Sequence, residues 1–261
     1  MCPTVEISQT AGLGSHDNTF IAQQNVNEGL SINEAVDIAF RLFHEYYPQL
    51  KKEALADVRK WLDTYLQTVL PQDITPPSSR IAVPALQNAS ITEEPEIRQM
   101  YAALLANSMN KVVKNGVHPG FVEIIKQLCP DEAKILRYMA TNPVIPIITL
   151  RMQDEKGEGY DLLKRFSDIG ERASCENPYE INKYFDNLIR LGILETPGEL
   201  SSLANKSLYD VLKNHSYIVG FKISLEYINP ELYETKFQES FIKITDYGNA
   251  FCKICLGAVD Q

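Results

Sequence analysis

The sequence predicts a mainly α protein, with an N-terminal helical domain followed by an α+β, winged-helix-like C-terminal domain. Apolar residues recur at helical spacing along most of residues 31–141. After residue 142, short stretches rich in β-branched residues alternate with helical patterns. The chain has 261 residues, of which 44% are hydrophobic, so it is long enough to bury a core of its own.

The predicted helical domain spans residues 29–129 and follows a polar tail. Residues 1–28 carry no apolar period, which is typical of a flexible tail. Ser31 and Glu34 have the spacing of a capping box and predict a helix over 31–47. The apolar spacing of residues 51–70 predicts the next helix.

Four prolines dominate residues 71–90, which we expect to form an extended Pro-rich arm without regular structure. Thr92 is expected to cap a helix over 92–113, because acidic residues follow it in the first turn, where the helix dipole favours them. The pattern therefore predicts a long connection between two helices of this domain.

Two short segments, which we call wedges, are each predicted to end one helix and begin another: the one around His118 and the one at Pro130. Asn115-Gly116 would end the preceding helix, because glycine adopts positive φ without strain. Pro119 and Pro130 can each stand in a first helical turn, where a missing N–H loses no hydrogen bond. His118 lies in the first wedge and is expected to cap a helix through its imidazole rather than to act in catalysis.

The predicted winged-helix-like domain spans residues 130–261. Gly192 would end its third helix, Thr245 would cap its last helix, and residues 196–240 would form an insertion within the wing. Three helices are expected at 131–141, 160–169 and 178–191, and strands at 143–150, 193–195, 217–227 and 241–245.

Charge and cysteine content limit the classes of partner and compartment. The chain has 25 basic and 34 acidic side chains, a net charge of −9, which disfavours general binding to nucleic acid or anionic membranes. Five scattered cysteines, no signal-peptide pattern at the N-terminus and no apolar run of membrane-spanning length predict a cytoplasmic protein without a membrane span.

The residues reveal no catalytic, cofactor-binding or metal-binding constellation. Cys252 and Cys255 form the single CxxC pattern, but a structural zinc site needs four ligands, so we expect both thiols to pack inside a helix. Asp131 and Glu132 begin a predicted helix, and the helix dipole accounts for their position without a hydrolase site. A hidden nuclease or other toxin is a weaker hypothesis that a metal-dependent cleavage assay would address.

The winged-helix pattern raises nucleic-acid binding as the alternative hypothesis. Its contacts would be Lys183, Asn187 and Arg190 on the predicted third helix, with Lys206 in the insertion. Residues 177–261 contain 8 basic and 11 acidic side chains, a net charge of −3, whereas a phosphate-facing domain needs an excess of cations. We therefore favour protein contact over binding to DNA.

Four stretches in this order resemble the bacterial abortive-infection alpha (Abi-alpha) family. They are LLANSMN, HPGFVEIIKQLCPDEAKIL, YFDNLIRLGIL and ITDYGNAFCKIC, and the resemblance runs from about residue 35 to the C-terminus. RIAVPAL fits the extended arm that the family shows before the Thr92 helix. The motif that carries the resemblance structurally is His118, Pro119, Phe121, Pro130, Asp131 and Glu132. The chain departs from the family at Cys129, where serine is expected, and at Gly120, where serine or alanine is usual.

The resemblance implies phage resistance through abortive infection, and it supplies no catalytic residue. The hypothesis is therefore a non-enzymatic antiphage defence protein that binds a phage or host component. A phage-derived, host or companion defence protein would be its partner, and the sequence is also compatible with a homo-oligomer.

Overall fold

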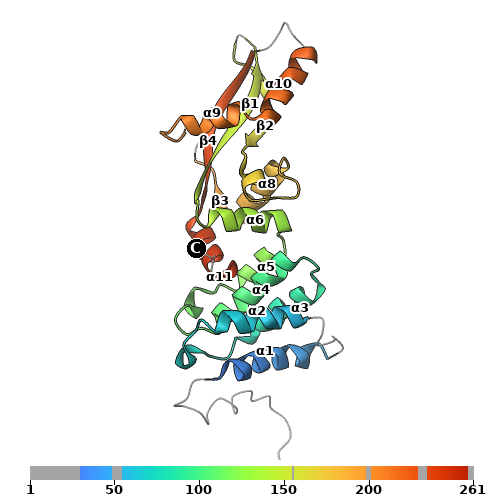
Figure 1. Ribbon diagram of the computed structural model, residues 1–261, viewed down its shortest axis with the longest axis vertical. Coiled ribbons are helices and arrows are strands. Elements are labelled where there is room, and N and C mark those ends of the chain that lie inside the picture. The colour runs from blue at the N-terminus through green and yellow to red at the C-terminus, as the bar shows by residue number, and fades with distance from the viewer. Residues whose placement is uncertain (1–29, 49–54, 155, 198–200, 229–233, 258–261) are drawn as a thin grey trace, which may run out of the picture.

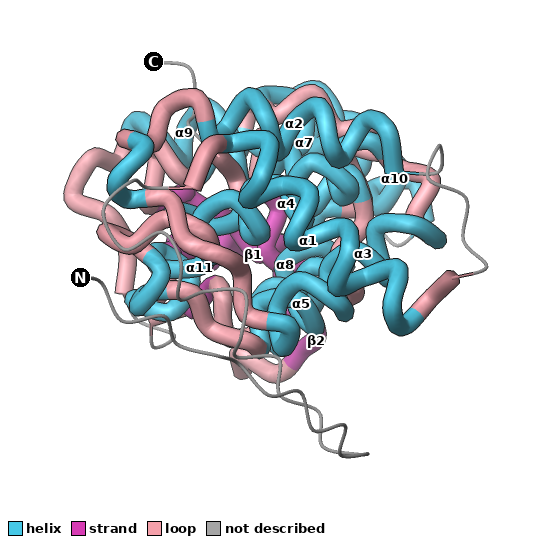
Figure 2. The backbone as a smooth tube through the Cα atoms, turned by 90° about the horizontal axis from the view of Figure 1, so that it is seen from below, coloured by secondary structure: helices cyan, strands magenta, loops and turns pink. Residues whose placement is uncertain are grey.

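The computed structural model describes residues 30–48, 55–154, 156–197, 201–228 and 234–257. These residues form eleven α-helices and one antiparallel four-stranded sheet, so the chain is helix-rich. The molecule is elongated, with helices at one end and most of the sheet at the other (Figure 1). Seen from below, along the long axis, the N-terminal helices lie in front of the strands (Figure 2). The predicted tail, residues 1–28, lies outside the described residues.

Five helices, which we call the helical body, make up the N-terminal end of the molecule. The predicted capping box at Ser31 and Glu34 is confirmed, with both reciprocal hydrogen bonds present. Arg98 ties three helices together, because it pairs with Asp57 and also donates to the backbone oxygens of Ala89 and Thr92. The helices are α1 (Ile32–Tyr46), α2 (Ala56–Leu66), α3 (Ser79–Ile91), α4 (Pro95–Ser108) and α5 (Gly120–Ile125).

The prediction of a fully extended Pro-rich arm over 71–90 is wrong, because α3 occupies its second half. Pro84 lies inside this helix and removes one backbone donor. The helix still forms because it buries a side at helical spacing, which includes Ile81, Ala85 and Leu86. The amide of Asn88 donates to the Pro84 oxygen at 2.7 Å. Burial of one helical face therefore outweighs the local cost of a proline.

Two predicted helix ends in the body are also wrong. Thr92 does not cap α4; it ends α3, and its hydroxyl donates to the Asn88 oxygen at 2.8 Å. The helix α4 begins at Pro95, which tolerates a first-turn position, and it ends at Ser108. Gly116 lies in a short 3-10 helix, η3 (Lys114–Gly116), and is not among the glycines of positive φ. Another 3-10 helix, η2 (Pro71–Asp73), precedes α3.

The second half of the chain builds the sheet and the helices around it. The strand order is β2-β1-β4-β3, and every pair is antiparallel. The long β1–β4 pair runs in unbroken register from Val144 opposite Lys243 to Gln153 opposite Glu234. The elements are α6 (Pro130–Met139), β1 (Val144–Gln153), β2 (Gly159–Phe166), α7 (Ile169–Arg172), α8 (Ile181–Arg190), β3 (Leu194–Glu195), α9 (Ser207–Lys213), α10 (Ser216–Ile228), β4 (Glu234–Ile244) and α11 (Asp246–Cys255).

Two elements of this half have the opposite secondary structure to the prediction. Residues 160–169 are not a helix: β2 pairs with β1 after a turn in which Asp154 accepts from the N–H groups of Lys156 and Glu158. Residues 217–227 are not a strand but most of α10, because the alternating apolar pattern is filled in by further apolar residues such as Ile218. A helix can bury Ile218 against the sheet without extending the sheet edge.

Most of the buried apolar side chains among the described residues fall into two clusters. The larger joins the helical body to α6, α8, α11 and the base of the sheet. The smaller lies in the part that we call the distal lobe, the described residues of 144–166 and 201–244, and contains Ile148, Phe166, Tyr209, Leu212 and Ile218. The distal lobe is therefore held by a small core of its own. A domain boundary at residue 129/130 stays a prediction.

Gly248 sets how closely α11 approaches β3. The predicted Thr245 cap is confirmed, since its hydroxyl accepts from the Gly248 N–H at 2.8 Å. The Thr245 N–H in turn donates to the Ile193 oxygen at 3.0 Å. A Cβ on Gly248 would lie 2.1 Å from that same oxygen, which is backbone and cannot rotate away. Gly192, whose φ is 72°, ends α8 as predicted and leads into this contact.

We expect Gly248→Ala to lower the free energy of unfolding by about 2–3 kcal/mol, because the added methyl group forces α11 away from β3. The control is Gly220→Ala in α10, where a Cβ would meet no atom within 4 Å. That substitution is expected to stabilise the helix by about 0.5–1 kcal/mol. Urea unfolding of both variants measures the difference, and equal stabilities would refute this close approach.

Candidate functional site

His118 lies one residue before the N-cap of α5, and its imidazole bonds the backbone at the start of that helix, in keeping with the structural role expected for it. Its Nδ1 accepts a hydrogen bond from the Gly120 N–H at 3.0 Å, and its backbone oxygen accepts from the Phe121 N–H at 3.0 Å. A Cβ on Gly120 would lie 2.9 Å from that imidazole nitrogen, which explains why glycine suits this position. The imidazole is thus occupied by the backbone, and the capping interaction requires Nδ1 to be unprotonated.

The same motif joins α5 to α11 through aromatic side chains. The Phe121 ring lies edge-on to the ring of Phe251, with centroids 5.4 Å apart, and is tilted against that of Tyr247 at 5.5 Å. The His118 ring also contacts Tyr247, at 6.1 Å. These contacts connect residues far apart in sequence, so the HPGF stretch fixes where the C-terminal helix docks.

Asp131 lies at the centre of a second junction, between α6 and the segment that leads to α8. Its side chain is almost fully buried, and the residue is only 5% exposed. Its carboxylate accepts from the N–H groups of Glu176 (2.8 Å) and Asn177 (2.9 Å) and from the hydroxyl of Tyr184 (2.9 Å). Lys134 lies 3.2 Å away and supplies positive charge. We call this arrangement the Asp131 clamp, because donors from the protein engage both carboxylate oxygens.

Glu132 makes the parallel connection from α6 to α8. The residue is 3% exposed, and its carboxylate accepts from the Cys129 N–H and from the Asn187 amide, each at 2.8 Å. The Asn187 amide also donates to the Gln127 oxygen at 3.0 Å. Pro130, as predicted, occupies the first turn of α6.

The two buried carboxylates have opposite pKa shifts. Burial alone would raise the pKa of Asp131, but the donors from Asn177, Glu176 and Tyr184 together hold its pKa below the ordinary value. Burial raises the pKa of Glu132, and its donors from Cys129 and Asn187 only partly offset that effect. Asp131 is therefore the carboxylate whose charge the fold stabilises.

The four side chains predicted to contact nucleic acid all have partners within the protein. Lys183 lies 2.7 Å from the Glu180 carboxylate, and Lys206 lies 2.6 Å from that of Glu239. Arg190 donates to the Gln127 side chain at 3.0 Å and to that of Asn187 at 2.6 Å. The Asn187 amide donates to the Glu132 carboxylate. Lys206 directly precedes α9 in the distal lobe, so it does not lie on α8 with the other three. A phosphate would have to compete with these partners.

The cysteines of the CxxC pattern are packed as predicted. Cys252 and Cys255 are both buried in α11, and burial raises the pKa of each thiol. Within the described part of the chain, no group of three or more His, Cys, Asp or Glu side chains is arranged to hold a metal ion. No described helix combines the length and apolar character that crossing a bilayer requires.

An exposed apolar face on α10 was missed by the sequence analysis. Val219 and Ile223 are 43% and 61% exposed, one helical turn apart, and Gly220 and Ser224 beside them are exposed as well. The ammonium group of Lys222 lies over the Phe237 ring, 5.5 Å from its centroid, and so turns toward β4. Figure 1 shows α10 at the end of the molecule farthest from α1. The signal in the sequence is a helix-length segment without a polar face.

We expect Asp131→Asn to lower the free energy of unfolding by about 2–3 kcal/mol at neutral pH, because an amide cannot accept from all of the donors that surround it. Glu123→Gln is the control, since Glu123 is exposed and lies 3.8 Å from Lys126; its effect should stay within about 0.5 kcal/mol.

The pH dependence of this loss follows from the lowered pKa of Asp131. Its charge contributes fully above the unfolded pKa of about 4, and the contribution is lost as pH falls through the lower folded-state pKa. The difference in free energy of unfolding between wild type and Asp131→Asn should therefore become smaller at acidic pH. Guanidinium unfolding at several pH values measures it, and a difference that grows below about pH 4 would contradict the clamp.

The comparisons with known proteins place this geometry in a family. One solved structure, described as that of an uncharacterised protein from the hydrocarbon-degrading marine bacterium Alcanivorax borkumensis SK2, is 18% identical, with a TM-score of 0.37 over 51% of this chain and 90% of that one. No curated protein matches. The family model described as abortive infection alpha matches residues 50–255, which include both junctions and α11. The chain therefore belongs to the abortive infection alpha family.

Proposed function

We propose that this protein acts in antiphage defence by binding a protein of phage or host origin through the exposed face of α10. The observation that carries the proposal is the pair of exposed apolar side chains, Val219 and Ile223, one helical turn apart on α10. Exposed apolar patches at the surface of a folded domain commonly mark protein contacts. Membership of the abortive infection alpha family supplies the biological setting.

The charges support a protein partner over a nucleic acid. The net charge is −9, and the cations predicted to face phosphates, such as Lys183 and Arg190, already have internal partners. Lys222 turns back toward β4, so it places no charge beside Val219 and Ile223. A partner with an apolar surface matches these two side chains.

The C-terminal half also supports a winged-helix-like organisation used for packing. Its chain order is α6, β1, β2, α7, α8, β3, α9, α10 and β4, and β4 lies between β1 and β3 in the sheet. The four-residue α7 takes the place of the predicted second helix. The side of α8 that carries Asn187 is bound to α6 and residue 127, so that side serves the interior of the protein.

The thiols support action in a reducing compartment. Cys129, Cys175, Cys252 and Cys255 are free in the described part of the chain. Burial raises the pKa of all four, with that of Cys175 at about 12. Free thiols of low reactivity are the usual state in the cytoplasm, where a defence protein would meet phage components.

We expect expression of the wild-type protein in a sensitive bacterium to reduce phage plaquing, and the variant Val219→Lys/Ile223→Lys to lose that protection. Two charges on this face oppose burial against an apolar partner. Because both side chains are exposed, the purified variant should melt within about 2 °C of wild type.

The control is Val211→Lys on α9, which adds a charge at another exposed position of the distal lobe, where Val211 is 54% exposed. It should protect as wild type does. Unchanged plaquing across a broad phage panel with the wild-type protein would count against the defence role. Protection that survives the double substitution would move the contact away from α10.

We expect no mobility shift of duplex DNA at low salt, because the candidate contacts are internally paired. A shift that weakens steeply with salt, and that Lys183→Gln/Arg190→Gln abolishes, would support the nucleic-acid alternative. Both substitutions remove cations that partner Glu180 and Gln127, so circular dichroism of the variant must match that of wild type.

A further inference from the structure

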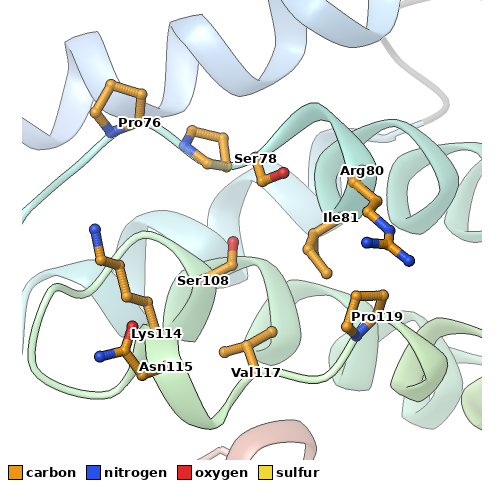
Figure 3. A pocket seen from close by; sticks show the side chains of 10 residues that line it. Pro76, Ser78, Arg80, Ile81, Ser108, Lys114, Asn115, Val117 and Pro119 are labelled. Carbon is orange, nitrogen blue, oxygen red and sulfur yellow. The ribbon is translucent and has the colours of Figure 1, made fainter.

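A pocket lies where the Pro-rich arm meets the His118 wedge. Its volume is about 440 Å³, and it is open to solvent on one side. Figure 3 shows the start of α3 on one side and the segment 114–119 on the other. Pro76 and Pro77 line it from the arm, and Ile81, Val117 and Pro119 complete its apolar walls. A cavity of this size is in the range of small-molecule sites.

Two cations in this pocket lack a partner. Arg80 in the first turn of α3 and Lys114 at the start of η3 both line it, and neither has a carboxylate or other side-chain partner among the described residues. In this acidic chain most described lysines and arginines do have one, as Lys206 has Glu239. No aspartate or glutamate lines the pocket. The pocket is thus a local positive site on a negative protein.

Other polar groups of the lining suit an anionic ligand as well. Ser78 precedes α3, yet its hydroxyl does not cap the helix. The N–H groups of Ser79 and Arg80 therefore have no side-chain acceptor there, whereas that of Ile81 donates to the Ser78 backbone oxygen at 2.9 Å. The Asn115 amide lies beside Lys114 and can donate. The Ser108 hydroxyl also lines the pocket, but it already donates its hydrogen to the Leu105 oxygen at 2.6 Å. The available donors are therefore Arg80, Lys114, Asn115 and the start of α3, and the remaining walls are largely apolar.

We propose that this pocket binds a small soluble organic phosphate. Arg80 and the start of α3 would hold the phosphate, because a guanidinium can donate to two phosphate oxygens at once. Lys114 and Asn115, at the other end of the pocket (Figure 3), would bind a second polar group. The apolar part of the ligand would lie against Pro77, Ile81 and Pro119.

The test is thermal unfolding of the full-length protein at constant ionic strength, with AMP, pyrophosphate and adenosine as probes. AMP should raise the unfolding midpoint saturably, by about 3–6 °C at tenfold excess over its Kd. Pyrophosphate should do so to a smaller extent, because it lacks an apolar part. Adenosine lacks the phosphate and should have no effect. An equal effect of AMP and adenosine would overturn the proposal, and so would the absence of any effect.

Matched variants separate the pocket from general electrostatics. Arg80→Gln/Lys114→Gln should weaken AMP binding at least tenfold. Lys60→Gln/Lys253→Gln removes the same charge at two exposed positions elsewhere and should leave binding unchanged. Equal weakening in both pairs would show only a non-specific attraction and overturn the site. Ser78→Trp keeps the charge but fills the cavity, and it should also abolish binding.

A lipid headgroup also carries a phosphate, so an experiment with vesicles distinguishes a lipid from a soluble ligand. Sedimentation with phosphatidylcholine vesicles, with and without phosphatidylglycerol, should capture no wild-type protein, because a net charge of −9 opposes adsorption to an anionic bilayer. Capture that needs phosphatidylglycerol and is lost in Arg80→Gln/Lys114→Gln, without stabilisation by AMP, would overturn a soluble ligand.

Discussion

The buried carboxylate of Asp131 is the interaction on which the arrangement of the second half depends. It stands in the first turn of α6 and accepts from the backbone at residues 176 and 177 and from Tyr184 on α8. Removing water from a carboxylate is costly, and several good donors are needed to offset that cost. Because those donors come from two other segments, Asp131 is satisfied only when α6, the α7–α8 connection and α8 are in place together. Glu132 likewise joins α6 to α8, because its carboxylate accepts from the Asn187 amide.

The distal lobe depends on a different kind of contact. Its own core is small, and its attachment near α7 is made by stacked rings: Tyr217 lies between Phe166 and Tyr179, with nearly parallel planes on both sides. Glu171 accepts from the Tyr179 hydroxyl and contacts His215, whose other ring nitrogen accepts from the Tyr217 N–H. These donors lower the pKa of Glu171. The base of α10 is thereby fixed, while its Val219 and Ile223 side chains stay exposed.

Local sequence rules predicted the helix ends well where the chain itself supplies the hydrogen-bond partner. Ser31 with Glu34, Gly192 and Thr245 are correct because the cap lies within three or four residues of the group it satisfies. The same holds for His118, whose imidazole reaches only two residues along the chain. The CxxC thiols were placed correctly for a similar reason, since their helical spacing beside an aromatic residue puts both on one buried side.

Apart from the helix ends at Thr92 and Gly116, the failures concern segments whose structure is decided by distant contacts. Pro84 argued against a helix, but the packing of α3 in the body outweighs one lost hydrogen bond. Leu163 and Phe166 suited a helical face equally well, and only pairing with β1 makes that segment an edge strand. The pocket could not be found from sequence, because Arg80 and Lys114 are more than thirty residues apart and their shared cavity exists only once α3 lies over η3.

The pocket and α10 lie far apart in the molecule, and packing contacts lead from one towards the other (Figure 1). Pro119 lines the pocket, and two residues later Phe121 packs against Tyr247 and Phe251 of α11. The helix α11 follows β4, which pairs with β1 from Glu234 to Lys243. A series of contacts thus leads from the pocket to the sheet. Contiguity alone does not couple two sites; an element with two arrangements is also required. At the junction of α11 with β3, the close approach at Gly248 and the Thr245 cap hold the helix against the backbone of Ile193, so these contacts fix the last link of the series.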